Sequence, residues 1–131
     1  MKKPAGYATL VVLLHLAVSV FHGAGHEKLH IAITDFQQKF VVVVVLAAPV
    51  LAAILLWTRL RAVGAWLLLA SMAAAFVFGL YYHFIYPSPD NVAMIPPMDG
   101  RLPFQVTAVL LAVLEALGCW LGMRMLRRTP V

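Results

Sequence analysis

The stretch FHGAGHEKLH, residues 21–30, ends the first long apolar run of the chain. It contains three of the five histidines, spaced four residues apart: His22, His26 and His30. Charged and polar side chains continue as far as Lys39, too many for a segment inside a hydrocarbon core. We therefore expect residues 22–39 to lie at a membrane surface and the apolar runs on either side of them to be membrane helices.

The form of this surface segment is predicted from its periodicity. Apolar residues recur at helical spacing after His26, which favours either a short interfacial helix as far as Lys39 or the first turns of the next membrane helix. Gly23 and Gly25 give the backbone freedom to bend just before that point. We expect the first membrane helix to end near Phe21.

The composition of the chain indicates which solvent surrounds it. Apolar residues make up 63% of the 131 residues and charged residues only 11%, whereas soluble domains have about 45–50% and about 25%. A soluble fold of this length could not bury so much apolar surface, so we expect a lipid bilayer. The net charge of +5 is divided among loops rather than gathered in a patch, which argues against nucleic acid as a partner. The single cysteine, Cys119, excludes an intrachain disulfide and a cysteine-based zinc cage.

Four apolar segments predict a single domain with four membrane crossings. Their expected bounds are about 4–21, 40–57, 62–83 and 104–123. Backbone hydrogen bonds must close within each segment in lipid, so we expect helix even for the five valines at 41–45. The proline-rich residues 87–103 predict a loop. The first segment also fits a secretory signal peptide with a cleavage site near Ala17–Ser19, but three more apolar segments follow it.

The distribution of basic residues predicts how the bundle is oriented. Seven of the ten Lys and Arg residues lie with the two termini and the turn at 58–61, and three lie on the other side. The side richer in Lys and Arg is cytoplasmic. The sequence therefore predicts an all-α, four-helix integral membrane bundle of up-down topology, with both termini cytoplasmic. The histidine segment and loop 87–103 would be extracytoplasmic, and the location would be a bacterial inner (cytoplasmic) membrane.

Four of the five histidines fall on the predicted outer side: His22, His26, His30 and His83. Residues four apart share a helix face, and neutral imidazole binds Cu, Zn, Fe and Ni. These side chains are candidate ligands of a transition metal, with carboxylates from Glu27, Asp35 or Asp90 completing the shell. Haem held by two histidines of different helices is a variant of the same hypothesis. The alternative is that the histidines are ordinary amphipathic side chains at the interface.

A second candidate site combines His15 and Glu115. Each lies about halfway along its predicted crossing, so both should reach a similar depth in the membrane. Ionisable groups inside a membrane usually face the bundle interior and take a partner. We predict that the two side chains meet, either as a proton-carrying pair or as a structural hydrogen bond.

Two features predict how the helices bend and associate. Pro49 lacks a backbone N–H and is expected to kink the second helix. Gly118 and Gly122 form a GxxxG pair, which is typical of close helix contacts and offers a homodimer interface.

Three hypotheses for the function follow from these patterns. The first is a redox or metal-handling membrane protein with an extracytoplasmic histidine site. The second is a dimeric, proton-coupled small transporter that uses Glu115 and His15. The third is an accessory subunit of a larger membrane complex without chemistry of its own. The sequence does not decide whether the chain is an enzyme, because it contains no phosphate-binding loop, nucleophile elbow or dinucleotide fingerprint.

Overall fold

The computed structural model describes residues 2–128, which form only helices, turns and irregular connections. The elements in chain order are α1 (Lys2–Lys28), α2 (Asp35–Phe40), η1 (Val41–Ala47), α3 (Ala48–Leu55), α4 (Arg61–Leu80), η2 (Tyr81–Ile85) and α5 (Arg101–Arg127). They join into four continuous helices that are long and apolar enough to cross a membrane: Lys3–Lys28, Asp35–Leu55, Arg61–Ile85 and Arg101–Arg127. The prediction of an all-helical chain with four such spans is confirmed.

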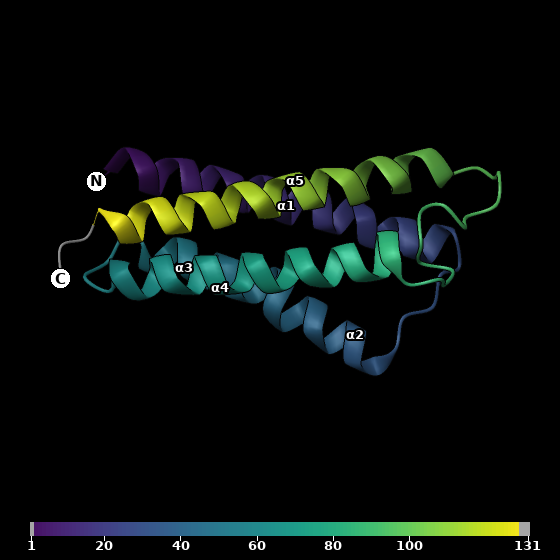
Figure 1. Cartoon of the computed structure of the whole chain (residues 1–131), viewed down its shortest axis with the longest axis horizontal. Helices are drawn as coiled ribbons and strands as arrows, with labels where there is room; N and C mark the ends of the chain where they lie inside the picture. The colour runs from purple at the N-terminus through teal and green to yellow at the C-terminus, as the bar shows by residue number, and fades with distance from the viewer. Residues whose placement is uncertain (1, 129–131) are drawn as a thin grey trace.

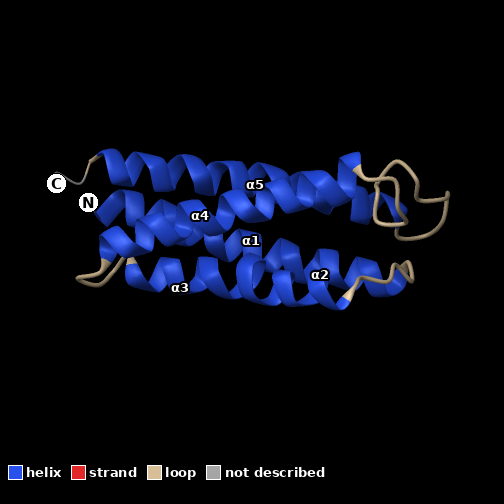
Figure 2. Cartoon of the chain, turned by 60° about the horizontal axis from the view of Figure 1, so that its bottom comes forward, coloured by secondary structure: helices blue, strands red, loops and turns tan. Residues whose placement is uncertain are grey.

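The four helices lie side by side as a bundle (Figures 1 and 2). The start of α1, the turn between α3 and α4 and the end of α5 lie at one end, which we call the terminal end. The connections 29–34 and 86–100 lie at the opposite end, which we call the loop end. Large apolar side chains on every helix face outward, among them Leu13, Val43, Val77 and Val109. Such a surface suits lipid better than water.

The terminal half of the bundle is held together by small residues in close contact. A methyl group added to Gly64 would lie 2.9 Å from the backbone nitrogen of Leu56, and one on Gly118 would lie 2.6 Å from Cγ of Met72. Small residues let helix backbones approach closely, which is how apolar helices associate without a hydrophobic driving force. The buried core here consists of Ala5, Ala8, Val12, Ala52, Ala53, Leu56, Ala65, Leu68, Met72 and Leu121.

The end of α1 differs from the prediction. The helix continues through Gly23 and Gly25 to Lys28, so an interfacial helix beginning at His26 is wrong. The expected alternative, polar first turns of the next membrane helix, is found only from Asp35 onward. A glycine inside a helix costs only about 0.5–1 kcal/mol, and the ring of Phe104 packs where a Gly25 side chain would be, with Cδ2 at 3.0 Å. Close packing therefore outweighs the flexibility that the two glycines offer.

His30, not a glycine, ends α1. Its φ is +54°, the N–H of Ile31 donates to the carbonyl of His26, and that of His30 donates to the carbonyl of Glu27. This pair of bonds is a Schellman closure with its left-handed residue at His30. The chain then runs without helix as far as Thr34, whose side chain and backbone exchange hydrogen bonds with Gln37 in a capping box that starts α2.

The second crossing bends between α2 and α3. The ribbon of α2 leaves the bundle, while α3 lies beside α4 (Figure 1). Between them η1 has π-helical geometry and ends just before the buried Pro49, which cannot donate the usual backbone hydrogen bond. Phe40 at the end of α2 stacks on Phe78 of α4, with ring centroids 4.4 Å apart. The five valines predicted as helix are helical, in the π form.

Candidate metal site

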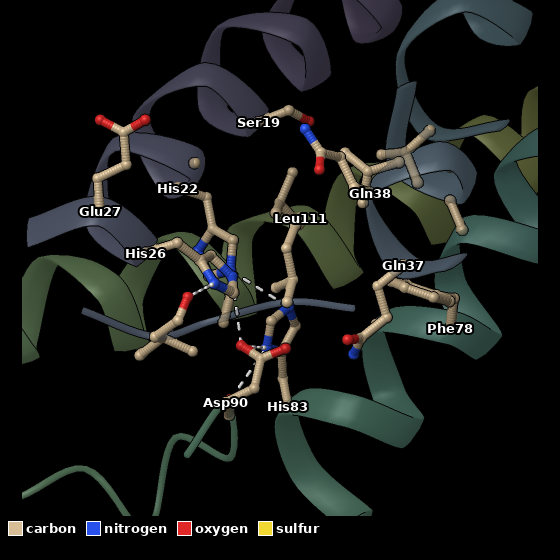
Figure 3. Close-up of a pocket in the computed structure, with 18 of the residues that line it drawn as sticks. Ser19, His22, His26, Glu27, Gln37, Gln38, Phe78, His83, Asp90 and Leu111 are labelled. Atoms are coloured by element: carbon tan, nitrogen blue, oxygen red, sulfur yellow. Dashed lines mark hydrogen bonds and ion pairs between the residues drawn. The ribbon is translucent and has the colours of Figure 1, made fainter. Parts of the chain in front are cut away.

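Four side chains that can bind metal gather at the loop end of the bundle. They are His22 and His26 of α1, His83 of η2 and Asp90 of the following connection. Each offers one ligand atom, and all four atoms lie within 4.8 Å of one another. Figure 3 shows the four side chains pointing toward one another. His22, His83 and Asp90 are buried and His26 is half-buried. We call this group the histidine cluster.

Local backbone structure brings the four residues together. His22 and His26 are one helical turn apart on α1. His83 sits in the π-helical turn η2, which the N–H of Tyr86 closes by donating to the carbonyl of Tyr81. The chain then folds back over His83, because the N–H of Val92 donates to the His83 carbonyl at 2.9 Å. This return places Asp90 beside the imidazole.

Each imidazole of the cluster has an oxygen atom near its Nδ1. For His22 this is Oγ1 of Thr107 at 2.8 Å, for His83 the carbonyl of Asp90 at 3.1 Å, and for His26 the carbonyl of Ile31 at 3.4 Å. A carbonyl can only accept. The single hydroxyl hydrogen of Thr107 is directed at the carbonyls of Pro103 and Phe104, so the lone pairs of Oγ1 are left to accept from His22. These partners assign the ring proton of each neutral histidine to Nδ1.

With the rings neutral, the Nε2 atoms of the three histidines are therefore acceptors. Nε2 of His22 lies 3.2 Å from Nε2 of His83, and Nε2 of His26 lies 3.2 Å from Oδ1 of Asp90. Lone pairs that face each other at this distance repel unless a cation lies between them. Either a proton or a metal ion would satisfy them, and two nitrogens bound tetrahedrally to one zinc ion stand about 3.3 Å apart.

Oδ1 of Asp90 also needs a cation nearby. The residue is only 7% exposed, and Oδ1 lies 3.1 Å from Nδ1 of His83 and 3.2 Å from Nε2 of His26. Neither approach has hydrogen-bond geometry, and this buried oxygen accepts no hydrogen bond from any residue in 2–128. A buried carboxylate oxygen without such a bond is costly unless a cation is close, so the donor set fits a bound cation.

Phe104 forms the apolar support of the cluster. It is 1% exposed, stacks on His22 with ring centroids 4.3 Å apart, and meets the edges of His26 and His83. Leu29, Ile31 and Ile95 join it in a small buried core beneath the connections. This packing limits the rotamers of the imidazoles and keeps water away, as an apolar shell around a metal site does.

The other predicted outer ligands lie outside this group. His30 is exposed because its left-handed backbone ends α1. Glu27 is exposed and points away from the cluster (Figure 3). Asp35 is exposed and pairs with Lys39, Oδ2 to Nζ at 2.7 Å. Regular spacing along one helix face thus proves a poor guide here: two members of the series join the cluster and the third closes the helix.

The second predicted pair is in contact. Nε2 of His15 lies 3.2 Å from Oε1 of Glu115, and both residues are buried. The contact joins the middle of α1 to the middle of α5, as their positions along the sequence indicate. The geometry fits both readings of the pair, a structural hydrogen bond and a site that holds a proton.

A cavity of about 650 Å³ extends from the histidine cluster to Glu115. All four crossings contribute to its walls: Ser19 and Gly23 from α1, Gln38 and Val41 from the second crossing, Phe78 and Gly79 from α4, and Leu111 from α5. His15 is not among the lining residues, so Glu115 stands between the cavity and His15. The two candidate sites that the sequence suggests separately share one cavity.

Thr107 and Phe104 are the site residues that sequence reasoning missed. Both lie on α5, and Thr107 is two steps of four residues before Glu115, with Leu111 between them on the same face. This spacing was a usable signal, because a threonine in line with an intramembrane glutamate faces the bundle interior. No comparable signal marks Phe104 as the support of the cluster.

The predicted helix-contact glycines are both buried within the chain. A methyl group on Gly118 would meet Met72, and one on Gly122 would meet Leu69 at 3.0 Å. The pair thus packs against α4 of the same chain. A homodimer stays a prediction and would need another face of the molecule or a rearranged α4.

Comparison of the chain with protein-family models, with curated proteins and with solved structures gives no match in any of the three. The function is therefore inferred from the geometry and chemistry of the site.

Proposed function

We propose that this chain is an integral membrane protein that binds one divalent transition-metal ion through His22, His26, His83 and Asp90. The observation that supports this most strongly is the orientation of the rings. Each imidazole has its Nδ1 next to an oxygen acceptor, Nε2 of His22 faces Nε2 of His83, and Nε2 of His26 faces Oδ1 of Asp90. Metal-binding histidines have this arrangement, with the second nitrogen held by an outer hydrogen bond.

The ligand types favour zinc among the divalent metals. Three imidazoles and one carboxylate give the four nitrogen and oxygen donors of a tetrahedral site. A set without thiolate does not select Cu(I) or an iron–sulfur cluster. Copper(II), nickel and iron also bind such donors, so the measurement of bound metal described below should include all four metals.

A metal ion fits the cluster better than haem. The rings of His22 and His83 are in edge contact, with centroids 4.7 Å apart. The two axial ligands of a haem stand on opposite faces of the porphyrin, so their rings cannot touch. Haem would require α1 and η2 to separate, whereas an ion requires only a small contraction around it.

The charge distribution supports an extracytoplasmic site. The basic residues predicted to be cytoplasmic belong to the terminal end, and the cluster lies at the loop end. In a bacterial inner membrane this orientation would place the cluster on the periplasmic side. The proposed role is therefore metal handling at the outer face, and labelling of Lys28 or Lys39 from outside whole cells tests that orientation.

The decisive experiment measures bound metal in protein purified into lipid nanodiscs. We expect about one zinc ion per chain after loading and dialysis. His83→Ala should lose the ion, whereas the matched change His30→Ala, four residues beyond His26 but outside the cluster, should keep it. X-ray absorption should show only nitrogen and oxygen ligands at about 2.0–2.1 Å. Equal metal content in both variants, or none in the natural chain, would refute the proposal.

The proton-coupled transporter is a weaker candidate because of the packing in the terminal half. The cavity reaches Glu115 from the loop end, and beyond it Gly118 and Gly122 hold α5 against α4. A path to the terminal end would require those two helices to separate. An accessory role in a larger complex does not require the histidine cluster to bind anything. Co-purification of partner subunits tests this role.

A further inference from the structure

At the inner end of the cavity lies a carboxylate oxygen without a hydrogen-bond partner among the described residues. Oε1 of Glu115 faces His15, and no hydrogen bond from residues 2–128 reaches Oε2. Oε2 lies 3.7 Å from the point where a Gly79 side chain would begin. Glycine at this position therefore leaves space in front of the oxygen. Glu115 itself is only 4% exposed, so Oε2 faces the cavity rather than the surrounding solvent.

Ser19 provides a second unpaired polar atom in the cavity wall. Its Oγ is buried and has no hydrogen-bond partner among the described residues. Buried polar atoms are normally satisfied by protein, water or a ligand. Ser19 on α1 and Glu115 on α5 thus line a space whose other walls are largely apolar, as in ligand pockets that fix an apolar molecule by a few polar contacts.

The charges around the cavity exclude one class of ligand. Among the described residues that line it are Glu27, Asp90 and Glu115 but no lysine or arginine. An anionic head group placed beside Oε2 would be repelled by the Glu115 carboxylate, and none of these lining residues is a lysine or arginine that would offset the repulsion. A head group that donates a hydrogen bond would instead be stabilised by Oε2.

The cavity also reaches the surface of the bundle. Gly23 and Gln38 are exposed and line the cavity, so it opens between α1 and α2. This is where α2 leaves the bundle (Figure 1). In a membrane, a molecule dissolved in the bilayer would enter by this side. The volume of about 650 Å³ lies within the range of small-molecule pockets, about 300–1,000 Å³.

We propose that this cavity binds an apolar molecule whose head group donates a hydrogen bond to Oε2 of Glu115. The chemical class is a phenol, an alcohol or a protonated amine with an apolar body, and not a carboxylate or phosphate. The proposed contact is with Glu115 and not with the metal ligands, although His22, His26, His83 and Asp90 also line the cavity. It stands on the cavity and on Glu115, so it holds whether or not the cluster binds metal.

The test uses three fluorescent probes that share one ring system: 2-naphthol, 2-naphthylmethylamine and 2-naphthoate. Binding to the protein in nanodiscs is followed by probe fluorescence, with empty nanodiscs subtracted. We expect saturable binding of the naphthol and the ammonium probe at one site, and binding of naphthoate about tenfold weaker or absent. The naphthol and the amine distinguish a neutral donor from a cationic one.

Variants assign the binding to this site. Glu115→Leu should abolish saturable binding of both donor probes, while Glu115→Gln keeps an acceptor and should mainly weaken the ammonium probe. Ala112→Leu fills the cavity while keeping the Glu115 carboxylate and should also abolish binding, whereas Ala116→Leu places the same side chain on the exposed face of α5 as a control. The two alanine variants decide the question even if the Glu115 variants do not fold.

Two outcomes would overturn the proposal: naphthoate that binds as tightly as naphthol, or Ala112→Leu that binds as well as Ala116→Leu. Zinc content measured on the same samples separates the two proposals. Zinc without probe binding would refute the ligand site alone, and probe binding without zinc would refute the metal site alone.

Discussion

The two halves of the bundle use the same four helices for opposite purposes. In the terminal half, alanines and glycines bring backbones into contact around a cluster of buried apolar side chains. In the loop half, the helices stand far enough apart for a cavity that is lined by the histidine cluster and by Glu115. Close packing at one end fixes the positions of the helices, so that polar groups can be held at the other end without collapse. Rigid elements that carry a polar site are the general condition for a precise site.

The largest expected effect is that of metal removal, which should destabilise the loop half and leave the terminal half unchanged. A bound ion stabilises the folded loop half by about 4 kcal/mol when free zinc is 1,000 times the dissociation constant. We expect a chelator to speed amide hydrogen exchange in η2 and in residues 86–100 and to leave the exchange of Ala65–Met72 unchanged. Uniform acceleration through all four helices would show that the halves are not independent.

A matched pair of glycine substitutions compares the packing of the two halves directly. Gly118→Ala adds a methyl group 2.6 Å from Met72 and should destabilise the bundle by about 1–3 kcal/mol. Gly23→Ala meets nothing within 4 Å among the described residues and should stabilise α1 by about 0.5–1 kcal/mol. Thermal unfolding in nanodiscs measures both. Equal effects would mean that the terminal half is not the tighter one.

Loss of the Thr107 hydroxyl should weaken metal binding without removing a ligand. Thr107→Val keeps the shape of the side chain and deletes the acceptor of the His22 Nδ1–H. Outer-shell partners of metal-binding histidines typically contribute about 10–100-fold in affinity, and we expect the lower value. Competition with a zinc-sensitive dye measures it, and Thr107→Ser should restore binding. Unchanged affinity in the valine variant would show that the ring orientation of His22 does not depend on this bond.

The smallest effect should come from the ion pair that ties the end of α1 to the loop before α5. Nζ of Lys28 lies 2.7 Å from Oδ2 of the exposed Asp99. The hydrogen bond and charge of Lys28 lower the pKa of Asp99 from its ordinary value of 3.8.

Because the folded-state pKa is the lower one, the ion pair stabilises the protein above pH 3.8. That contribution is lost as the pH falls through the lowered pKa. At pH 7 the Asp99→Asn variant should therefore have a slightly lower unfolding temperature than the natural chain. At pH 2 the two unfolding temperatures should be equal. A difference that persists at pH 2 would assign the effect to something other than this charge.

The sequence predicts what depends on hydrophobicity and on position along a helix. The four spans follow from apolar run length, and the contact of His15 with Glu115 follows from their similar depth. The failures concern the backbone at the loop end. Gly23 and Gly25 suggest a break, but the ring of Phe104, distant in sequence, packs against Gly25 within an intact helix. Local propensity cannot indicate such a tertiary contact.

The candidate cluster illustrates the same limit. Periodicity along α1 selects His22, His26 and His30 equally, yet a left-handed turn removes the last of them. Asp90 is one of three acidic candidates, and only the fold-back of residues 86–92 onto His83 distinguishes it. Spacing within one helix can be read from the chain, but the return path of a loop cannot.

The π-helical turn η2 has a consequence for how such a site can arise. A π turn contains one more residue than an α turn. Deleting one residue there, for example Tyr82, would restore α geometry and rotate His83 by about 100° around the helix axis. The imidazole would then face lipid or a neighbouring helix, although the composition of the chain would hardly change. One extra residue in this turn thus decides whether His83 faces the cluster, a property that a search for a histidine motif alone would not detect.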